Sequence, residues 1–262
     1  MVTGASSGIG RATAEELARR GYHVVAAGRS EQRTLPVVEG IIDAGGSGEF
    51  LPLDLASLDS AREAARQFTD SGRTLDVLVD NAGVGGVRGL TTDGFELHFG
   101  INHLGHFMLT HHLQPSFRAG SRIVVVSSEA HRGAPGIDFD RVQRKTRSLS
   151  RLRDYGVSKL ANILFARSLA RRHPEWRTYS LHPGVVDTGI FPAFVKPFMK
   201  LTTPEEGAAT SVWCATSDEV ADESGLYYSR QRRRDPSNVA MDDGLAEELW
   251  HRSEQWCEVT RH

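Results

Sequence analysis

The stretch Thr3-Gly4-Ala5-Ser6-Ser7-Gly8-Ile9-Gly10 decides the fold, because its glycines fall between a short apolar run and a helical pattern. We expect a strand over Met1–Thr3 and a helix over Ile9–Arg20. Glycine backbone can approach a pyrophosphate closely, and the helix N-terminus presents unpaired N–H groups with a partial positive charge. An ordinary glycine-rich turn has the same composition, but the position between strand and helix favours a nucleotide-binding turn. Its predicted contacts are Gly4, Ser6, Ser7, Gly8, Ile9 and Gly10.

Beyond this turn, short runs rich in β-branched residues alternate with amphipathic segments. This alternation is typical of a parallel sheet covered by helices, and two such halves form a doubly wound sheet that binds ligands beyond the carboxyl ends of its strands. We therefore predict a single α/β domain with a Rossmann fold over residues 1–262. Only three residues precede Gly4, so either the first strand is unusually short or the true start of the protein lies upstream of Met1. The further predicted strands are His23–Ala27, Glu49–Leu53, Val77–Asp80, Arg122–Ser127 and Thr178–His182, and the further helices are Ser57–Ser71 and Gly156–His173.

The composition argues against several classes of protein. The 31 basic and 33 acidic residues leave a net charge of -2, whereas a nucleic-acid-binding protein usually has a basic excess. Cys214 and Cys257 match no metal-ligand spacing, so we expect no metal site. No apolar run reaches the length of a membrane span, and no charged-then-apolar leader begins the chain. We therefore expect a cytoplasmic protein without a membrane span.

The end of the second predicted strand bears on which nucleotide binds. A site for NAD usually places a carboxylate here to bind the ribose 2′-hydroxyl, whereas an arginine accommodates the 2′-phosphate of NADP. Gly28 supplies no carboxylate, and Arg29 supplies a guanidinium that can bind phosphate through two hydrogen bonds. The sequence therefore predicts NADP(H). The alternative is that Arg29 is a solvated surface arginine.

Two later strand ends contribute to the same predicted site. Asp54, followed by Leu55, lies where a carboxylate could accept a hydrogen bond from the adenine amino group, although Asp54 could equally cap the next helix. Asn81, Ala82 and Gly83 follow the fourth strand and are small where the nucleotide must pass. Each signal is weak alone, and the order of the signals along the chain gives them their strength.

A tyrosine and a lysine lie four residues apart at the head of a strongly amphipathic segment. Residues at this spacing share one face of a helix, so the ammonium of Lys159 comes close to the phenol of Tyr155. A nearby cation favours the phenolate and lowers the tyrosine pKa from about 10, which makes proton exchange feasible near neutral pH. The pair predicts general acid–base chemistry, although a surface helix could hold the same spacing by chance.

In their order, the glycine-rich turn, Asn81-Ala82-Gly83, Asn102, Ser127-Ser128 and Tyr155 with Lys159 resemble the short-chain dehydrogenase/reductase family over nearly the whole chain. Asn102-His103-Leu104-Gly105-His106-Phe107 and His182-Pro183-Gly184-Val185-Val186-Asp187-Thr188 look like its retinol-dehydrogenase-like branch. The resemblance implies an oxidoreductase that moves a hydride between NADP(H) and a carbonyl or secondary alcohol. It also implies a homodimer or homotetramer.

The resemblance implies a role for each matching residue. Tyr155 would be the general acid in reduction and the base in oxidation, and Lys159 would hold the nicotinamide ribose and lower the tyrosine pKa. Ser128, with Ser127 as the alternative, would bind the substrate oxygen. Asn102 would kink its helix and anchor a water in a proton relay to Lys159. The residues implied to line the nicotinamide are Pro183, Gly184, Val186 and Thr188.

Three further segments bear on substrate and assembly. The insert of about residues 131–153 is rich in arginine, and it is either solvated surface or a basic rim that attracts an anionic substrate or carrier. Residues of about 185–203 are rich in Phe, Pro and Met and could close over a fairly hydrophobic substrate, or pack on the core or a partner subunit. The segment Asp242–Cys257 could likewise pack on the core or on a neighbour. The basic residues of the insert are Arg141, Arg144, Lys145, Arg147, Arg151 and Arg153.

Two other functional classes stay open at this point. The same fold and tyrosine could run a redox-neutral epimerisation or cyclisation, because fold does not determine function. A non-catalytic regulator could also bind NADPH. Net consumption of NADPH distinguishes simple oxidoreduction from the redox-neutral reaction, and unchanged function in Tyr155→Phe would mark the regulator.

Overall fold

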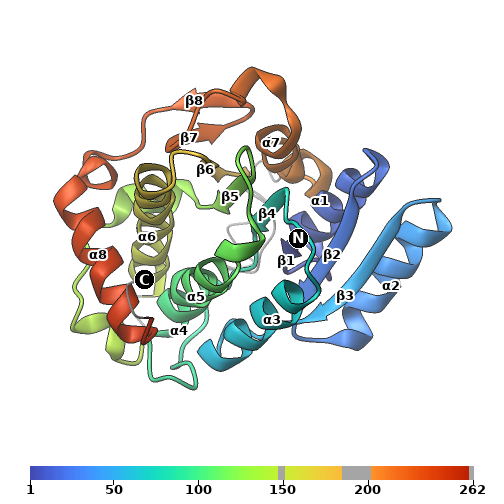
Figure 1. Ribbon diagram of the computed structural model, residues 1–262. Helices are drawn as coiled ribbons and strands as arrows, with labels where there is room; N and C mark the ends of the chain where they lie inside the picture. The colour runs from blue at the N-terminus through green and yellow to red at the C-terminus, as the bar shows by residue number, and fades with distance from the viewer. Residues whose placement is uncertain (147–150, 185–201, 260–262) are drawn as a thin grey trace.

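The protein, described here by a computed structural model over residues 1–146, 151–184 and 202–259, is built on one twisted sheet with helices on both faces (Figure 1). The strands are β1 (Val2–Thr3), β2 (His23–Gly28), β3 (Ser47–Pro52), β4 (Val77–Asp80), β5 (Arg122–Val126), β6 (Arg177–His182), β7 (Leu226–Ser229) and β8 (Arg232–Arg234). They lie in the order β3-β2-β1-β4-β5-β6-β7-β8, and every neighbouring pair is parallel except β7 with β8. The chain extends from β1 in one direction and from β4 in the other, which confirms the predicted doubly wound sheet.

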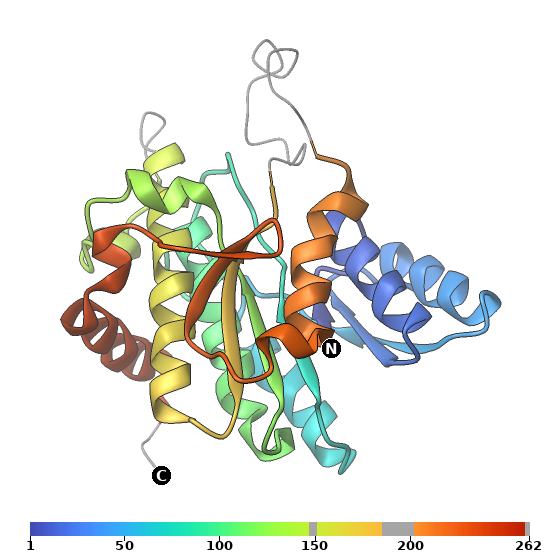
Figure 2. The same cartoon turned by 90° about the horizontal axis from the view of Figure 1, so that it is seen from above.

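Helices form a layer on each face of the sheet (Figure 2). They are α1 (Gly8–Arg19), α2 (Glu31–Asp43), α3 (Leu58–Asp70), α4 (Leu97–Phe99), α5 (Gly105–His112), α6 (Arg151–Arg172), α7 (Pro204–Thr216) and α8 (Asp243–Trp256). The apolar side chains of α1, α2 and α7 form one core, and those of α3, α5, α6 and α8 form the other. The central strands are buried on both sides, which explains why β5 is almost continuously apolar.

The C-terminal helix α8 packs on the core of its own chain. The ring of Trp250 lies 5.0 Å from that of Phe107 on α5, and the guanidinium of Arg172 on α6 lies 4.4 Å from the Trp250 ring. Leu249 and Trp250 are both buried. Of the two placements that the sequence allowed for this segment, the structure shows the intramolecular one.

The structure also differs from the sequence-based expectations at several elements. The third strand runs over Ser47–Pro52 rather than Glu49–Leu53, and α6 begins at Arg151, one turn before the predicted start. The helix α2 was not predicted, because Pro36 and Gly40 inside it weaken its helical signal. No helix bounds were predicted for α4, α5 and α8, and the hairpin of β7 and β8 was not predicted. Over the described ranges, no helix combines the length and apolarity that crossing a membrane requires.

Candidate active site

The glycine-rich turn has the geometry that a phosphate-binding turn needs. Gly4 and Gly8 adopt left-handed backbone angles with φ of 69° and 55°, which favour glycine. A Cβ on Gly10 would lie 2.3 Å from the carbonyl oxygen of Gly4, so no larger residue fits there. Ser7 precedes α1 in an extended conformation, and its side chain does not cap the helix. The first N–H groups of α1 are therefore left for a ligand, and the turn fits the phosphates of a dinucleotide.

Thr3 joins the ends of β1 and β4 at the centre of the sheet. Its hydroxyl accepts hydrogen bonds from the backbone N–H of Asn81 at 3.0 Å and of Ala82 at 2.9 Å. The side-chain amide of Asn81 donates in return to the carbonyl oxygen of Thr3 at 2.8 Å. These bonds hold the glycine-rich turn and the Asn81–Gly83 loop together where the strand order reverses, which is where ligands of such sheets bind. Sequence analysis had not assigned Thr3 a role, and its only signal was its place directly before Gly4.

The other predicted nucleotide contacts lie along the same edge. Arg29 is exposed directly after β2 and forms no ion pair with any described residue. Asp54 accepts a hydrogen bond from the N–H of Ala56 at 3.0 Å and does not cap α3, whose first turn is capped by Ser57. Leu55 is buried, with its carbonyl oxygen 2.6 Å from where a Cβ on Gly105 would lie.

Asn102 lies in a π-helical turn, η1 (Gly100–Leu104), that interrupts the helix between α4 and α5. This irregular turn is the distortion that the resemblance implied at this residue. The side chain of Asn102 accepts from the N–H of Val84 at 2.8 Å and donates to the hydroxyl of Ser158 at 2.9 Å. The backbone carbonyl oxygen of Asn102 accepts a hydrogen bond from Nδ1 of His106 at 3.1 Å. This contact is consistent with a neutral imidazole, because burial lowers the pKa of His106 to about 4. Asn102 thereby links the loop after β4 to α6.

Tyr155 lies in the second turn of α6, and its phenol interacts with the side chain of Ser128, the second residue after the end of β5. Burial raises the pKa of Tyr155, and the bond to Ser128 partly opposes that rise. The expected lowering of this pKa by Lys159 is not seen in the structure. The two groups predicted to contact the substrate oxygen are nevertheless brought together by elements 27 residues apart in sequence.

Lys159 lies beside the tyrosine at the base of the site. Its Nζ donates to the carbonyl oxygen of Val126 at 2.9 Å and lies 5.8 Å from the centroid of the Tyr155 ring. Burial lowers the Lys159 pKa to about 8. A Cβ on Gly83 would lie 3.4 Å from Nζ, so the Asn81–Gly83 loop passes directly over the ammonium.

The structure distinguishes the two candidate serines. The hydroxyl of Ser127 is buried and donates to the carbonyl oxygen of Lys159 at 2.6 Å. Ser128 remains partly exposed, accepts from the N–H of Ala130 at 3.2 Å and is the serine that interacts with the phenol of Tyr155. Of the two serines, only Ser128 therefore has a partly exposed side chain.

A buried glutamate–histidine pair behind Tyr155 was missed by sequence analysis. Nδ1 of His98 lies 2.8 Å from Oε1 of Glu96, and the His98 ring packs edge-on against that of Tyr155, with centroids 6.1 Å apart. The backbone N–H of Glu96 donates to the carbonyl oxygen of Val142 at 2.6 Å, and the Thr146 hydroxyl bonds to the Glu96 carboxylate. Burial opposes ionisation of Glu96, but its hydrogen bonds and the His98 charge outweigh it and lower the Glu96 pKa. A glutamate and a histidine two residues apart give no periodic signal.

The basic insert is consequently anchored to the site and is more than a solvated surface segment. Val142 and Thr146 are buried, and Nε of Arg141 pairs with Asp154, next to Tyr155, at 3.1 Å. Arg144 and Lys145 are exposed. Arg147 and the side chain of Arg151 lie outside the described residues.

The predicted nicotinamide contacts are only partly described. Pro183 and Gly184 follow β6, and Gly184 has a φ of 101° that favours glycine. Val186, Thr188 and most of the predicted substrate flap, residues 185–201, lie outside the described residues. Thr202, at the other end of that stretch, has its hydroxyl 2.8 Å from where a Cβ on Gly184 would lie.

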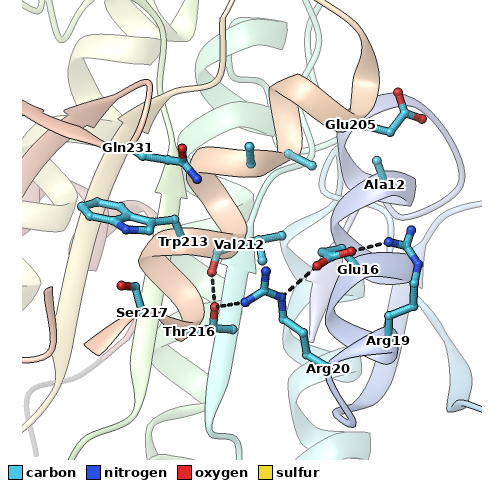
Figure 3. A pocket seen from close by; sticks show the side chains of 12 residues that line it. Ala12, Glu16, Arg19, Arg20, Glu205, Val212, Trp213, Thr216, Ser217 and Gln231 are labelled. Carbon is cyan, nitrogen blue, oxygen red and sulfur yellow. Dashed lines mark hydrogen bonds and ion pairs between the residues drawn. The ribbon is translucent and has the colours of Figure 1, made fainter. Parts of the chain in front are cut away.

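The cavities on the described surface include one large and one smaller cavity. One, of about 1160 Å³, lies at the carboxyl ends of β6 and β7 and includes Pro183 and Gly184 in its lining. The other, of about 330 Å³, lies between α1 and α7, where Arg20 bonds to Glu16 at 2.9 Å and to Thr216 at 3.2 Å (Figure 3). None of the described catalytic or nucleotide-site residues lines this smaller cavity. In the parts of the chain that the structure describes, no group of three or more His, Cys, Asp or Glu side chains is arranged to hold a metal ion.

Comparison with known proteins agrees with this geometry. The family model for short chain dehydrogenases matches residues 1–138. Human dehydrogenase/reductase SDR family member 13 is 40% identical over 97% of this chain and 72% of its own length, and human retinol dehydrogenase 14 is 40% identical over 97% and 84%. An uncharacterized protein from Mycobacterium paratuberculosis has a similar crystal structure, with a TM-score of 0.82 and 35% identity over 98% of this chain and 91% of that one. A short chain dehydrogenase from Burkholderia cenocepacia, solved in complex with NADP, has a TM-score of 0.69 and 25% identity over 92% and 96%.

Proposed function

The chain belongs to the short-chain dehydrogenase family, in its retinol-dehydrogenase-like branch, and we propose that it is an NADP(H)-dependent oxidoreductase acting on a carbonyl or secondary alcohol. The observation on which this proposal depends most is the contact between Ser128 and Tyr155, with Lys159 beside the tyrosine ring. In this proposal a substrate oxygen binds between the hydroxyl of Ser128 and the phenol of Tyr155. A substrate oxygen at that point would receive two hydrogen bonds.

In the direction of reduction, Tyr155 would give the proton of its hydroxyl to the substrate oxygen, and Ser128 would hold that oxygen in place. Bound NADP(H) would supply the hydride in this direction and accept it in the other. Lys159, kept in position by the carbonyl oxygen of Val126, would stabilise the phenolate that remains on Tyr155. The carbonyl oxygen of Asn102 uses one lone pair for His106, and its second lone pair is our proposed anchor for a water that returns a proton towards Lys159.

The proposed preference for NADP(H) is supported by Arg29. Its guanidinium is exposed at the end of β2, where the ribose of the nucleotide would lie, and no described acidic side chain neutralises it. The Arg29→Gln variant should raise the KM for NADPH about tenfold or more and leave that for NADH nearly unchanged. Arg144→Gln, which removes an equally exposed arginine away from this edge, is the matched control. Better use of NADH than of NADPH by the wild type would contradict the proposal.

The experiment that tests the proposed reaction follows NADPH absorbance with a panel of hydrophobic ketones and aldehydes. Tyr155→Phe should lower kcat by about 10²-fold or more, because it removes the acidic proton and keeps the ring. The control variant Tyr22→Phe removes the hydroxyl of a tyrosine that directly precedes β2, far from Tyr155 in sequence. It should leave kcat unchanged. If the wild type turns over a substrate without net consumption of NADPH, the reaction is redox-neutral. Equal activity of the wild type and Tyr155→Phe would refute the role of the tyrosine.

A fairly hydrophobic substrate, a cytoplasmic location and a homodimer or homotetramer are further parts of the proposal. The name of human retinol dehydrogenase 14 supports a hydrophobic substrate, since retinol is an apolar alcohol. The other two were inferred from sequence and family resemblance. Cell fractionation tests the location, and light scattering after size-exclusion chromatography tests the assembly.

A further inference from the structure

The larger cavity is a cleft that begins at the proposed active site. Glu129 in its lining directly follows Ser128, and Pro183 and Gly184 are the described residues predicted to lie at the nicotinamide. The far wall is the hairpin of β7 and β8, which stands beside α7 at one end of the molecule (Figure 1). With a volume of about 1160 Å³, the cleft has room for a part of the substrate that extends beyond the reacting carbonyl.

Three arginines concentrate positive charge on this far wall. Arg230, Arg233 and Arg234 line the cleft, and none of them forms an ion pair with another residue in the described ranges. A fourth arginine, Arg132, is already bound, at 2.6 Å to the Glu129 carboxylate and at 2.7 Å to the carbonyl oxygen of Asp235. The three uncommitted guanidiniums can each offer two parallel N–H groups to a carboxylate or phosphate.

The three acidic side chains of the cleft cancel only part of the charge of its four arginines, which leaves a net charge of +1. Glu129 is neutralised by Arg132 and accepts a further hydrogen bond from the hydroxyl of Tyr227 at 2.9 Å. Glu206 is engaged in capping α7, where it accepts from the N–H of Thr203 at 3.1 Å. Asp235 is the remaining acidic residue in the lining. The cleft therefore retains a net positive charge close to where the substrate oxygen would bind.

The turn that presents this charge is conformationally costly. Arg230 and Gln231 connect β7 to β8 with φ of 53° and 56°, in the left-handed region that hairpin turns usually fill with Asn or Gly. A residue with a Cβ is strained in this region relative to the right-handed one. Both side chains line the cleft, and the N–H of Gln231 donates to the hydroxyl of Thr210 on α7 at 3.3 Å. Strained backbone of this kind is often retained where the side chains serve a function.

We propose that Arg230, Arg233 and Arg234 bind an anionic group, a carboxylate or phosphate, carried by the carbonyl or alcohol substrate. This inference rests on the proposed function, and it narrows the substrate class to hydrophobic compounds that bear an acidic group. In this proposal the basic segment that binds the anionic group of the substrate is thus the β7–β8 hairpin. The exposed residues Arg144 and Lys145 of the insert do not line the cleft.

Direct binding tests the anion site independently of turnover. Inorganic pyrophosphate is titrated calorimetrically into the protein saturated with NADP⁺, so that the phosphate-binding turn is already filled. The double variant Arg230→Gln/Arg233→Gln should bind pyrophosphate about tenfold or more weakly than the wild type, because two charge-assisted contacts are lost. Arg232→Gln removes the same kind of charge from the same strand but from a residue outside the cleft lining, and it should bind like the wild type. Equal binding by all three proteins overturns the proposal.

Kinetics test whether the anion belongs to the substrate. A medium-chain aldehyde is compared with the ω-oxo acid of the same chain length. The acid should have a KM lower by about tenfold in the wild type and in Arg232→Gln, and this advantage should disappear in the double variant. If pyrophosphate binding depends on the arginines but the acid has no advantage, the cleft binds free anions and the substrate assignment is wrong. If no carbonyl compound is reduced by any protein while arginine-dependent binding remains, the proposed function fails and the anion site stands.

Discussion

The hydroxyl of Ser127 donates to the carbonyl oxygen of Lys159 at 2.6 Å, which ties the end of β5 to α6 one turn after Tyr155. This bond occupies one of two adjacent serines and leaves Ser128 facing the phenol. It also helps to hold Lys159 against β5, where its ammonium reaches the carbonyl oxygen of Val126. We therefore expect a structural role for Ser127 and a catalytic role for Ser128.

The two serines should respond differently to alanine. Ser128→Ala removes the hydrogen bond to the substrate oxygen, so kcat should fall by about 10²-fold with little change in the free energy of unfolding. Ser127→Ala removes a buried hydrogen bond and should lower the free energy of unfolding by about 1 kcal/mol, with a smaller effect on kcat. Urea unfolding and initial rates measured on both variants check this assignment. If kcat falls further in Ser127→Ala than in Ser128→Ala, the roles assigned to the two serines are reversed.

Gly10→Ala should abolish tight nucleotide binding. The new Cβ would lie 2.3 Å from the carbonyl oxygen of Gly4 and 2.4 Å from Nδ2 of Asn81, so the turn must move away from the loop after β4. We expect the Kd for NADPH to rise about tenfold or more by calorimetry. Gly40→Ala, on the exposed side of α2, meets no atom within 4 Å and should gain up to about 1 kcal/mol of stability. Unchanged NADPH affinity in Gly10→Ala would show that the turn does not form the phosphate site.

Lys159 should make the stability of the nucleotide-free protein depend on alkaline pH. Its pKa is lowered by burial from 10.5 to about 8, so between these values the unfolded chain binds more protons than the folded one. The free energy of unfolding should therefore rise with pH across this window, by up to about 3 kcal/mol, relative to Lys159→Met. Urea titrations at about pH 7 and about pH 10 measure the difference between the two proteins. A constant difference would mean that Lys159 keeps its ordinary pKa.

Asp80 should make the free energy of unfolding fall with rising pH, in a window below that of Lys159. Burial raises the pKa of its carboxyl from 3.8 to about 8, although Thr110 donates a hydrogen bond to one oxygen at 3.2 Å. The folded state therefore holds a proton that the unfolded chain loses between about pH 4 and about pH 8, and stability falls as the pH rises through this window.

Asp80→Asn keeps the shape and removes the titration, so its advantage over the wild type should grow as the pH rises and exceed about 1 kcal/mol at pH 8. Asp59→Asn, which removes an exposed carboxylate that pairs with Arg62, is the control for the loss of a negative charge. Parallel unfolding curves of the wild type and Asp80→Asn at every pH would mean that the buried carboxyl titrates normally.

Much of the architecture was predictable because it depends on spacing along the chain. The alternation of apolar strands with amphipathic segments predicts a doubly wound sheet, and the glycines between β1 and α1 predict a phosphate-binding turn, since both patterns reflect local backbone geometry. The four-residue spacing of Tyr155 and Lys159 similarly places both on one face of a helix. The helix α2 escaped prediction because Pro36 contradicts local propensity, and packing of Val37, Val38 and Ile41 on the sheet overrides it.

What only the tertiary structure decided concerns groups brought together from distant segments. It selects Ser128 over Ser127, places His98 against Tyr155, joins Thr3 to Asn81, and gathers the hairpin arginines at the same cleft as Gly184. It also reverses the expected direction of the Tyr155 pKa, because desolvation by the folded protein acts more strongly on the phenol than the nearby lysine does. Contacts and desolvation depend on every chain segment that packs around a group, and the sequence around that group does not contain this information.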